Sequence, residues 1–420
     1  MKYELVIRNG LVLTPDGAQA TDLAISGNAI LALGGSFDGT EEFDADGAWV
    51  GPGLVDLHAH FREPGQEWKE DISSGSEAAA AGGYTAVVAM PNTQPAIDSG
   101  HIARLIRDRS RQVGLCEIIP AGAITMAREG AVLSHLDELW EAGVRIFTDD
   151  GDSVSDTGLL RVAMEYLAER GAVVAQHAED RSLAAGGHMH EGSLSSRLGM
   201  KGIPAEAEEV VVTRDLALSR LTGCRYHVQH VSSARTVQLV STSKAAGLPV
   251  TAEVTPHHLA FDDAAVGSLD PLFKMYPPLR SVTDRDGLRA ALISGVIDAV
   301  ATDHAPHSAF ETEVPFEEAP RGVIGLETSA AAVLTYCHLD QASFFDRLSM
   351  APAQIGQIGR HGRPVAPGEP ANLTVIAPDE EWTVDAFRSK AENSPFRSLT
   401  LAGRVRATIF EGRLVHALVS

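Results

Sequence analysis

Two histidines separated by one residue, His58 and His60, end an apolar run that begins at Leu54. Side chains two positions apart lie on the same face of a β-strand, ~6–7 Å apart along it, so both imidazoles could point toward one ligand. Imidazole is the commonest metal ligand among side chains. A lone pair of this kind is more often two ordinary polar residues at the end of a strand. A metal site therefore needs further ligands elsewhere in the chain.

Acidic and histidine side chains also end four other short apolar runs. They are Asp149, Asp150, His177, His230, Asp303, His304 and His307. Nitrogen and oxygen donors without thiolate favour Zn²⁺, with Mn²⁺, Co²⁺ or Fe²⁺ as substitutes. The four histidines His58, His60, His177 and His230 and two of the carboxylates would make six ligands, which are too many for one four-coordinate ion. The pattern therefore predicts two ions ~3.5–4 Å apart, bridged by a carboxylate and a hydroxide.

Other histidines have simpler interpretations. His227 lies earlier in its strand than His230, which indicates a packed or supporting residue. His257 and His258 follow another apolar run and could touch the site.

The elements that must position these side chains can be read from the alternation of apolar runs and helical segments between residues 52 and 340. Strands are predicted at 53–60, 84–91, 116–123, 144–150, 172–178, 225–231, 249–256 and 297–304. Helices are predicted between them at 71–81, 99–111, 135–142, 157–170, 205–222, 233–246 and 284–294, and afterwards at 325–338 and about 343–357. Eight such units indicate an α/β fold of the (β/α)8 TIM-barrel type, in which chemistry occurs at the carboxyl ends of the strands. An open doubly wound sheet is the alternative, but no G-x-G-x-x-G or P-loop motif follows the early strands.

Both ends of the chain have the sequence pattern of β-strands joined by short turns. Residues 3–13, 22–33 and 43–50 read as strands, and the strand pattern returns after residue 361. We therefore predict a barrel over 52–360 and a small discontinuous β domain built from 1–51 and 361–420. Two insertions, 179–204 and 305–323, follow barrel strands and are candidates for active-site loops.

The composition limits the partners and the compartment. The formal net charge of −22 argues against nucleic acid and anionic membrane. No apolar run is long enough to span a bilayer, and residues 1–10 lack the apolar segment of a signal peptide. The three cysteines are far apart and odd in number, which predicts free thiols and a cytoplasmic protein. An anionic substrate would need local positive charge at the site.

Several longer motifs contain the predicted ligands. They are H-A-H-F-R-E-P-G at 58–65, M-P-N-T-Q-P at 90–95, F-T-D-D-G at 147–151, H-A-E-D at 177–180, H-V-S-S-A at 230–234, T-D-H-A-P-H at 302–307 and G-V-I-G-L-E-T at 322–328. With these motifs the chain resembles, over nearly its whole length, the class I dihydroorotases of the amidohydrolase superfamily.

The resemblance implies a role for each matching residue. One zinc ion would be held by His58, His60 and Asp303 and a second by His177 and His230, with Asp150 bridging them in place of the carboxylated lysine of related hydantoinases. The substrate's carboxylate would be bound by Arg62, Asn92 and His307. Further substrate contacts would come from Tyr276, Arg321 and Gly322.

Two of these positions depart from the family's pattern. Tyr276 stands where the family has an asparagine, and Arg321 stands where it has a phenylalanine. Tyrosine keeps a hydroxyl but loses the amide's two donors and its carbonyl acceptor. Recognition of the substrate ring at this position is therefore expected to differ.

The activity that the resemblance implies is the reversible cyclisation of N-carbamoyl-L-aspartate to (S)-dihydroorotate in pyrimidine biosynthesis, with Asp303 as the catalytic base. The alternatives are a related cyclic amidohydrolase, such as an allantoinase or dihydropyrimidinase, and a metal-free, inactive scaffold for aspartate transcarbamoylase. The resemblance also implies a homodimer and, for some members, association with aspartate transcarbamoylase.

Overall fold

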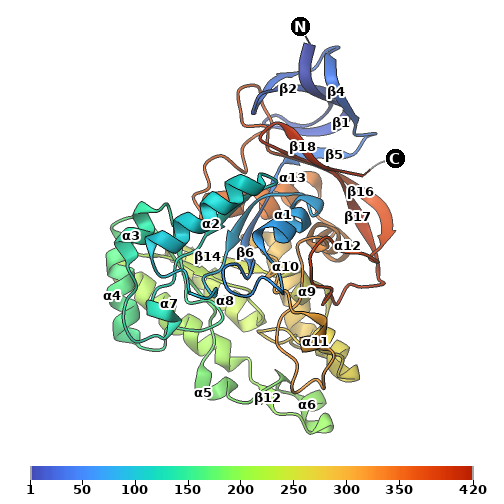
Figure 1. Cartoon of the computed structure of the whole chain (residues 1–420). Helices are drawn as coiled ribbons and strands as arrows, with labels where there is room; N and C mark the ends of the chain where they lie inside the picture. The colour runs from blue at the N-terminus through green and yellow to red at the C-terminus, as the bar shows by residue number, and fades with distance from the viewer. Residues whose placement is uncertain (1, 419–420) are drawn as a thin grey trace.

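The computed structural model describes residues 2–418 and contains two parallel sheets surrounded by helices (Figure 1). One sheet has the order β6-β7-β8 and the other β15-β14-β13-β10-β9. The bounds of these strands are Leu54–Ala59 (β6), Tyr84–Ala89 (β7), Glu117–Pro120 (β8), Ile146–Phe147 (β9), Val173–Gln176 (β10), Arg225–Val228 (β13), Val250–Val254 (β14) and Ala299–Val300 (β15). Every adjacent pair runs parallel, so the carboxyl ends of all eight strands emerge on the same side.

Backbone bridges link the two sheets at both of their edges. Gly122, just after β8, pairs in parallel with Phe147 of β9, and Ala59 of β6 pairs in parallel with His304, beyond the end of β15. The His60 N–H also donates to the His304 carbonyl (2.8 Å). The first and last of the eight strands are therefore neighbours at their carboxyl ends.

Helices follow the strands as the sequence predicts. Their bounds are Ile72–Ala81 (α1), Gly100–Val113 (α2), Leu136–Glu141 (α3), Thr157–Ala168 (α4), Glu206–Thr222 (α7), Ala234–Ala245 (α8), Val282–Ser294 (α10) and Ser329–Cys337 (α12). Asp71 begins α1 as an N-cap, accepting from the Ser74 N–H. The helix predicted at about 343–357 is instead three short pieces, α13 (Gln341–Phe345), a π-helical turn over 346–350 and α14 (Ala351–Ile355).

Both faces of the parallel strands are buried. Val55, Leu57, Val88 and Val173 pack in one apolar cluster together with Ile355 of α14 and its neighbours. The opposite faces belong to a larger cluster that includes apolar side chains of the surrounding helices. Burial on both faces explains why these strands read as continuous apolar runs.

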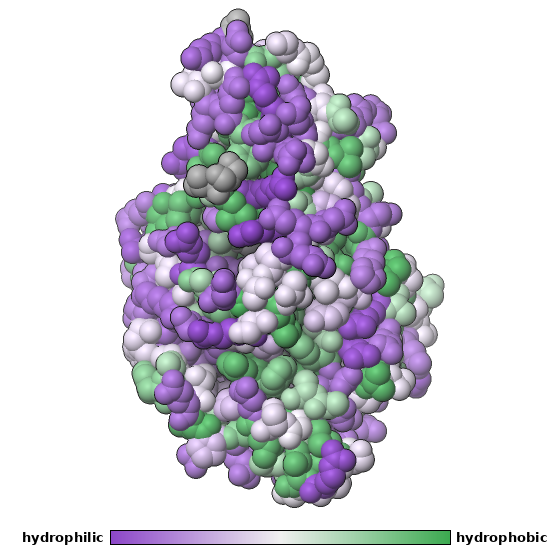
Figure 2. All heavy atoms as spheres, turned by 90° about the vertical axis from the view of Figure 1, so that its right-hand side faces the viewer, coloured by the Kyte–Doolittle hydropathy of each residue, from purple (hydrophilic) through white to green (hydrophobic). Residues whose placement is uncertain are grey.

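The two ends of the chain form one separate mixed sheet of eight strands. Its order is β18-β17-β16-β5-β1-β2-β3, with β4 paired to β1. The bounds are Lys2–Thr14 (β1), Gly17–Ser26 (β2), Ala29–Leu33 (β3), Asp38–Asp44 (β4), Trp49–Pro52 (β5), Leu373–Thr383 (β16), Thr400–Phe410 (β17) and Arg413–Ala417 (β18). The part of the surface over this sheet is mostly hydrophilic (Figure 2), while its apolar side chains form a core of their own.

The two predicted insertions contain short elements that lie beyond the strand ends. Residues 179–204 form α5 (Arg181–Ala184), β11 (Met189–His190), α6 (Ser193–Leu198) and β12 (Gly202–Ile203), and residues 305–323 contain α11 (Ala309–Thr312). Among the described residues, no helix has the length and apolar character needed to cross a membrane. The three cysteines are buried and unpaired.

Candidate metal centre and active site

The two histidines of the opening motif lie against two carboxylates. His58 Nε2 is 3.2 Å from Asp150 Oδ1 and 3.4 Å from Asp303 Oδ1. His60 Nε2 is 3.0 Å from Asp303 Oδ1 and 3.6 Å from Asp150 Oδ2. Burial alone would raise the pKa of Asp303, but His58 and His60 outweigh it and hold that pKa below the usual range of an aspartate. Burial would likewise raise the pKa of Asp150, but the neighbouring histidines, His58 first, hold it well below its usual value, so both carboxylates are ionised at neutral pH.

A second histidine pair lies on the other side of Asp150. His177 Nδ1 and His230 Nε2 are 2.9 Å apart and lie 3.9 and 3.8 Å from Asp150 Oδ1. Burial, followed by the nearby His230, lowers the pKa of His177 to about 3. His177 is therefore neutral, which is the form of imidazole that binds metals.

These residues fit a pair of metal ions. Two groups of potential ligand atoms, each within 4.8 Å of one another, consist of His58, His60 and Asp150 and of Asp150, His177 and His230. His58 Nε2, Asp150 Oδ1 and His177 Nε2 are buried and have no hydrogen-bond partner among the described residues. Buried polar atoms without partners are costly, and a cation shared by them would remove that cost. Asp150 alone belongs to both groups, as a bridging ligand must.

Backbone conformation singles out the same part of the chain. Arg62, His230 and Asp303 have φ angles of 59°, 31° and 45°. A non-glycine residue in this region costs of order 1–3 kcal/mol and persists where the surroundings impose it, often at functional sites. Two predicted metal ligands and the predicted carboxylate-binding arginine are therefore held in strained conformations.

Sequence reasoning missed Glu253, at the carboxyl end of β14. Its side chain is fully buried; Oε1 lies 2.9 Å from His58 Nδ1 and Oε2 lies 3.0 Å from His227 Nε2. A proton on His58 Nδ1 leaves the Nε2 lone pair directed at Asp150, so Glu253 sets the tautomer that a metal requires. Burial would raise the pKa of Glu253, but its bonds to His227 and His58 lower it to about 2. An acidic residue inside the apolar run 249–254 was the signal available in the sequence.

The buried cation Arg62 forms a second side of the site together with His307, whose pKa is lowered to about 3 by burial and then by Arg62, so that this histidine is neutral. Arg62 is 8% exposed, and its Nε donates weakly to the Pro306 carbonyl (3.4 Å). Burial lowers the pKa of Arg62 to about 10, which leaves it charged at neutral pH. His307 Nε2 bonds the Arg321 carbonyl (2.9 Å), while its buried Nδ1 has no partner among the described residues. Asn92 Oδ1 lies 2.9 Å from His60 Nδ1, so this side chain orients the imidazole of a predicted metal ligand.

The two residues that depart from the family's pattern touch one another. The Arg321 guanidinium lies 4.1 Å from the centre of the Tyr276 ring, and that ring lies 4.5 Å from the ring of His177. Arg321 also donates to the Gly187 carbonyl in the insertion 179–204 (2.6 Å). Tyr276 and Arg321 therefore form one stacked pair beside His177, a predicted metal ligand.

The remaining candidates have supporting positions. Asp149 accepts from the N–H groups of Ile124 and Thr125. His304 lies between Glu70 and the Gly325 N–H, and His258 between Thr255 Oγ1 and the Pro277 carbonyl. His257 is buried and its Nε2 has no partner among the described residues.

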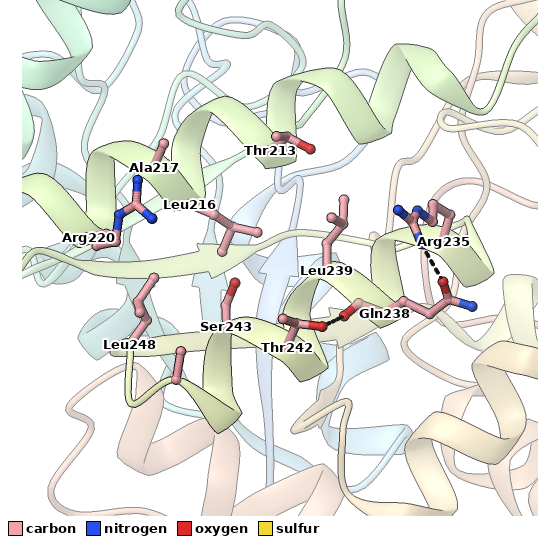
Figure 3. A pocket seen from close by; sticks show the side chains of 11 residues that line it. Thr213, Leu216, Ala217, Arg220, Arg235, Gln238, Leu239, Thr242, Ser243 and Leu248 are labelled. Carbon is pink, nitrogen blue, oxygen red and sulfur yellow. Dashed lines mark hydrogen bonds between the residues drawn. The ribbon is translucent and has the colours of Figure 1, made fainter.

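A groove of about 480 Å³ lies elsewhere, between α7 and α8. Figure 3 shows Leu216, Leu239 and Leu248 along it and Arg220 and Arg235 toward its ends. Its described lining residues include no histidine or carboxylate. The chemistry is therefore assigned to the strand ends.

Comparison with known proteins adds an independent line of observation. A family model described as dihydro-orotase-like matches residues 47–236. The chain is 43% identical to a dihydroorotase of Streptomyces coelicolor, over 97% of this chain and 99% of that protein. It is 45% identical to a dihydroorotase of Mycobacterium tuberculosis, over 90% of each.

Solved structures with the same fold are more distant in sequence. The L-hydantoinase (dihydropyrimidinase) of Arthrobacter aurescens superimposes with a TM-score of 0.87 at 25% identity, covering 99% of this chain and 98% of that one. A dihydropyrimidinase of Brevibacillus agri gives a TM-score of 0.82 at 24% identity, over 98% of this chain and 95% of that one.

Proposed function

The chain belongs to the dihydroorotase family, and from this premise we propose that it interconverts N-carbamoyl-L-aspartate and dihydroorotate with loss or gain of water. The observation that carries the proposal is the set of buried ligand residues around Asp150, taken together with the charged, buried Arg62 beside it. The ligand residues around Asp150 would serve the hydrolysis of the amide, and Arg62 would bind the substrate's carboxylate. The protein is on this basis a cyclic amide hydrolase.

We propose that the site holds two zinc ions. His58, His60 and Asp303 would hold one, His177 and His230 the other, and Asp150 would bridge them. Bound there, the ions would supply an activated water and polarise the carbonyl group under attack. The donor set of nitrogen and oxygen atoms fits zinc, and its lack of thiolate matches a catalytic site rather than a structural one.

Asp303 is the proposed acid–base residue. In the hydrolytic direction water adds across the ring amide: its oxygen bonds to the carbonyl carbon and the carbon–nitrogen bond breaks. Asp303 would accept the proton from water and deliver it to the leaving ring nitrogen. In the biosynthetic direction it would accept the proton of the attacking ureido nitrogen. Its lowered pKa keeps it ionised and ready to accept.

The substrate's carboxylate is proposed to bind against Arg62, Asn92 and His307. A guanidinium can bond both carboxylate oxygens in one plane, which a point charge cannot do. Neutral His307 has its ring proton toward the Arg321 carbonyl, so Nδ1 needs a second proton before it can donate to a carboxylate. The Gly322 backbone and the stacked pair Tyr276–Arg321 are proposed to form the wall beside the ring.

We also propose how the chain is divided. Residues 52–360 would form a closed (β/α)8 barrel, supported by the two bridges that join its sheets. Residues 1–51 and 361–420 would form one small β domain, supported by their shared sheet and separate core. We expect a homodimer, which analytical ultracentrifugation would test, alone and with aspartate transcarbamoylase present.

The direct test is an assay of zinc-loaded protein in both reaction directions. Dihydroorotate, allantoin and dihydrouracil would be offered side by side at equal concentrations. We expect turnover of dihydroorotate to exceed that of the other two by orders of magnitude, because only its carboxylate engages Arg62. Faster hydrolysis of dihydrouracil or allantoin would overturn the proposal.

A dihydropyrimidinase-type activity is the second candidate, and the likeness to a solved L-hydantoinase favours it. Tyr276, where the family has asparagine, points the same way. The higher identity to dihydroorotases argues against it. An inactive scaffold would have no use for a complete set of buried ligands, and the zinc content of the purified protein separates that case.

A further inference from the structure

The segment between β16 and β17 leaves the mixed sheet and packs against the helices beside the active-site rim. Val384 and Phe396 of this segment lie in one apolar cluster with Ala331 and Ala332 of α12 and Ala260 of α9 (Pro256–Ala260). Its middle, residues 388–393, contacts the loops that carry the proposed substrate-binding residues. We call residues 384–399 the strap.

One strap residue, Asn393, connects the two ends of the insertion 305–323 through its side chain. Its Oδ1 accepts from the His307 N–H (3.2 Å), and its Nδ2 donates to the carbonyls of Ala305 (3.1 Å) and Gly322 (3.0 Å). Its own carbonyl accepts from the Ile324 N–H (3.0 Å). Asn393 is 4% exposed, so these bonds are shielded from water. An amide alone among neutral side chains offers both donors and acceptors in this arrangement.

The strap is itself held firmly on the side that precedes Asn393. Ser389 Oγ donates to Glu70, whose Oε2 also lies 3.3 Å from His304 Nε2. The backbone N–H groups of Arg388 and Ser389 donate to the Glu327 carboxylate. The bonds of Arg388 and Ser389 therefore fix the part of the strap that precedes Asn393.

We propose that Asn393 is a positioning residue for the carboxylate-binding side of the site, which holds His307 and Gly322 at a fixed separation without touching the substrate. This inference rests on the proposed function. Without the amide, the two ends of the insertion 305–323 would have to be ordered when the substrate binds, and that free-energy cost would appear as a higher KM. The metal ligands and Asp303 are not bonded to Asn393, so kcat should change little.

The test compares Asn393→Ala with a matched variant, Asn372→Ala. Asn372 is 5% exposed and also joins two segments, donating to the Arg360 carbonyl (3.1 Å) and accepting from the Glu411 N–H (2.8 Å), but it contacts no residue of the site. Both variants lose a buried amide, so both should unfold at lower temperature. Only Asn393→Ala should raise KM for dihydroorotate, by roughly tenfold to a hundredfold, since a displacement of about 1 Å in a binding group has effects of this size. Zinc content should equal that of the wild type in both.

A second variant covers the case in which Asn393→Ala does not fold. Asn393→Asp keeps the shape and the oxygen that accepts from His307, but it presents an oxygen in place of the donor to Ala305 and Gly322. It should raise KM as well, with kcat within about threefold of the wild type. The positioning role is refuted if KM is unchanged in either folded Asn393 variant, or if Asn372→Ala raises KM by as much as Asn393→Ala does. Failure of the wild type to turn over dihydroorotate would instead refute the proposed function.

Discussion

Replacing Glu253 with glutamine should weaken zinc binding without disturbing the fold. The carboxylate is fully buried and accepts from His58 at 2.9 Å. A hydrogen bond to a charged partner contributes ~1.5–3 kcal/mol and a neutral one ~0.5–1.5 kcal/mol, so the neutral amide should lose about 1–1.5 kcal/mol at this bond. At about 1.4 kcal/mol per decade, that is roughly a five- to tenfold change. Loss of the negative charge near the two proposed cations should weaken zinc binding further. Mutation of residues that support metal ligands typically lowers metal affinity by about 10–100-fold.

The assay is activity of the Glu253→Gln protein as a function of free zinc, set with a chelator buffer. We expect the zinc concentration for half-maximal activity to rise by about tenfold to a hundredfold, with similar activity at saturation. Asp215→Asn is the control, because Asp215 is equally buried but its carboxylate bonds, among residues 2–418, only Arg214, Gln176 and Tyr226. Wild-type zinc affinity in Glu253→Gln, or the same loss in Asp215→Asn, would refute a role of Glu253 through His58.

Four further changes test other parts of the molecule. Arg62→Lys should raise KM for dihydroorotate by roughly tenfold or more with little change in kcat, since one ammonium cannot replace a two-pronged contact; an unchanged KM would remove Arg62 from the carboxylate site. Asp303→Asn should retain most of the zinc, measured by elemental analysis, while kcat falls by several decades; near-normal turnover would exclude it as the acid–base residue. Burial raises the pKa of Glu327 to about 7, so the native state binds more protons than the unfolded chain between about pH 4.5 and 7 and stability should fall as the pH rises through that window. Glu327→Gln should reduce this fall in urea unfolding, and identical pH profiles would contradict it. Tyr276→Asn and Arg321→Phe should be non-additive by about 0.5–2 kcal/mol in unfolding free energy, as expected for a half-buried cation–π pair, and strict additivity would show that the stack contributes nothing.

The order of elements could be predicted from sequence because each parallel strand is buried on both faces and each helix has an apolar stripe. The prediction was poorest where tertiary contacts override local pattern. The strand predicted at 297–304 is regular only over Ala299–Val300, and the chain then turns into a left-handed conformation at Asp303, a predicted metal ligand. The helix predicted after 343 is broken by a π-helical turn for which the sequence has no simple signal.

At the site, the sequence could predict which side chains lie at the carboxyl ends of the strands. Ligands on parallel strands meet at one edge, so His58, His177 and His230 could be placed together without a structure. Supporting groups could not be found in this way. Glu253 looks like any acid in a strand until His58 is seen against it, and Asn393 belongs to a strap that lies 86 positions from His307 in sequence. Bonds between such distant segments leave no local periodicity to read.

The net charge of −22 and the buried Arg62 can be understood together. The field of the whole protein repels an anionic substrate at long range, and salt screens that repulsion beyond ~10 Å at 0.1 M. Recognition must therefore come from charges met only inside the site, where the lower effective dielectric strengthens each contact. Burying Arg62 costs desolvation, as its lowered pKa records, yet leaves it charged. A carboxylate that reaches it meets a guanidinium with few competing partners. The same short stretch thus has two tasks: His58 and His60 face Asp150 and Asp303, while Arg62, two residues further on, provides a buried positive charge in a protein whose net charge is negative.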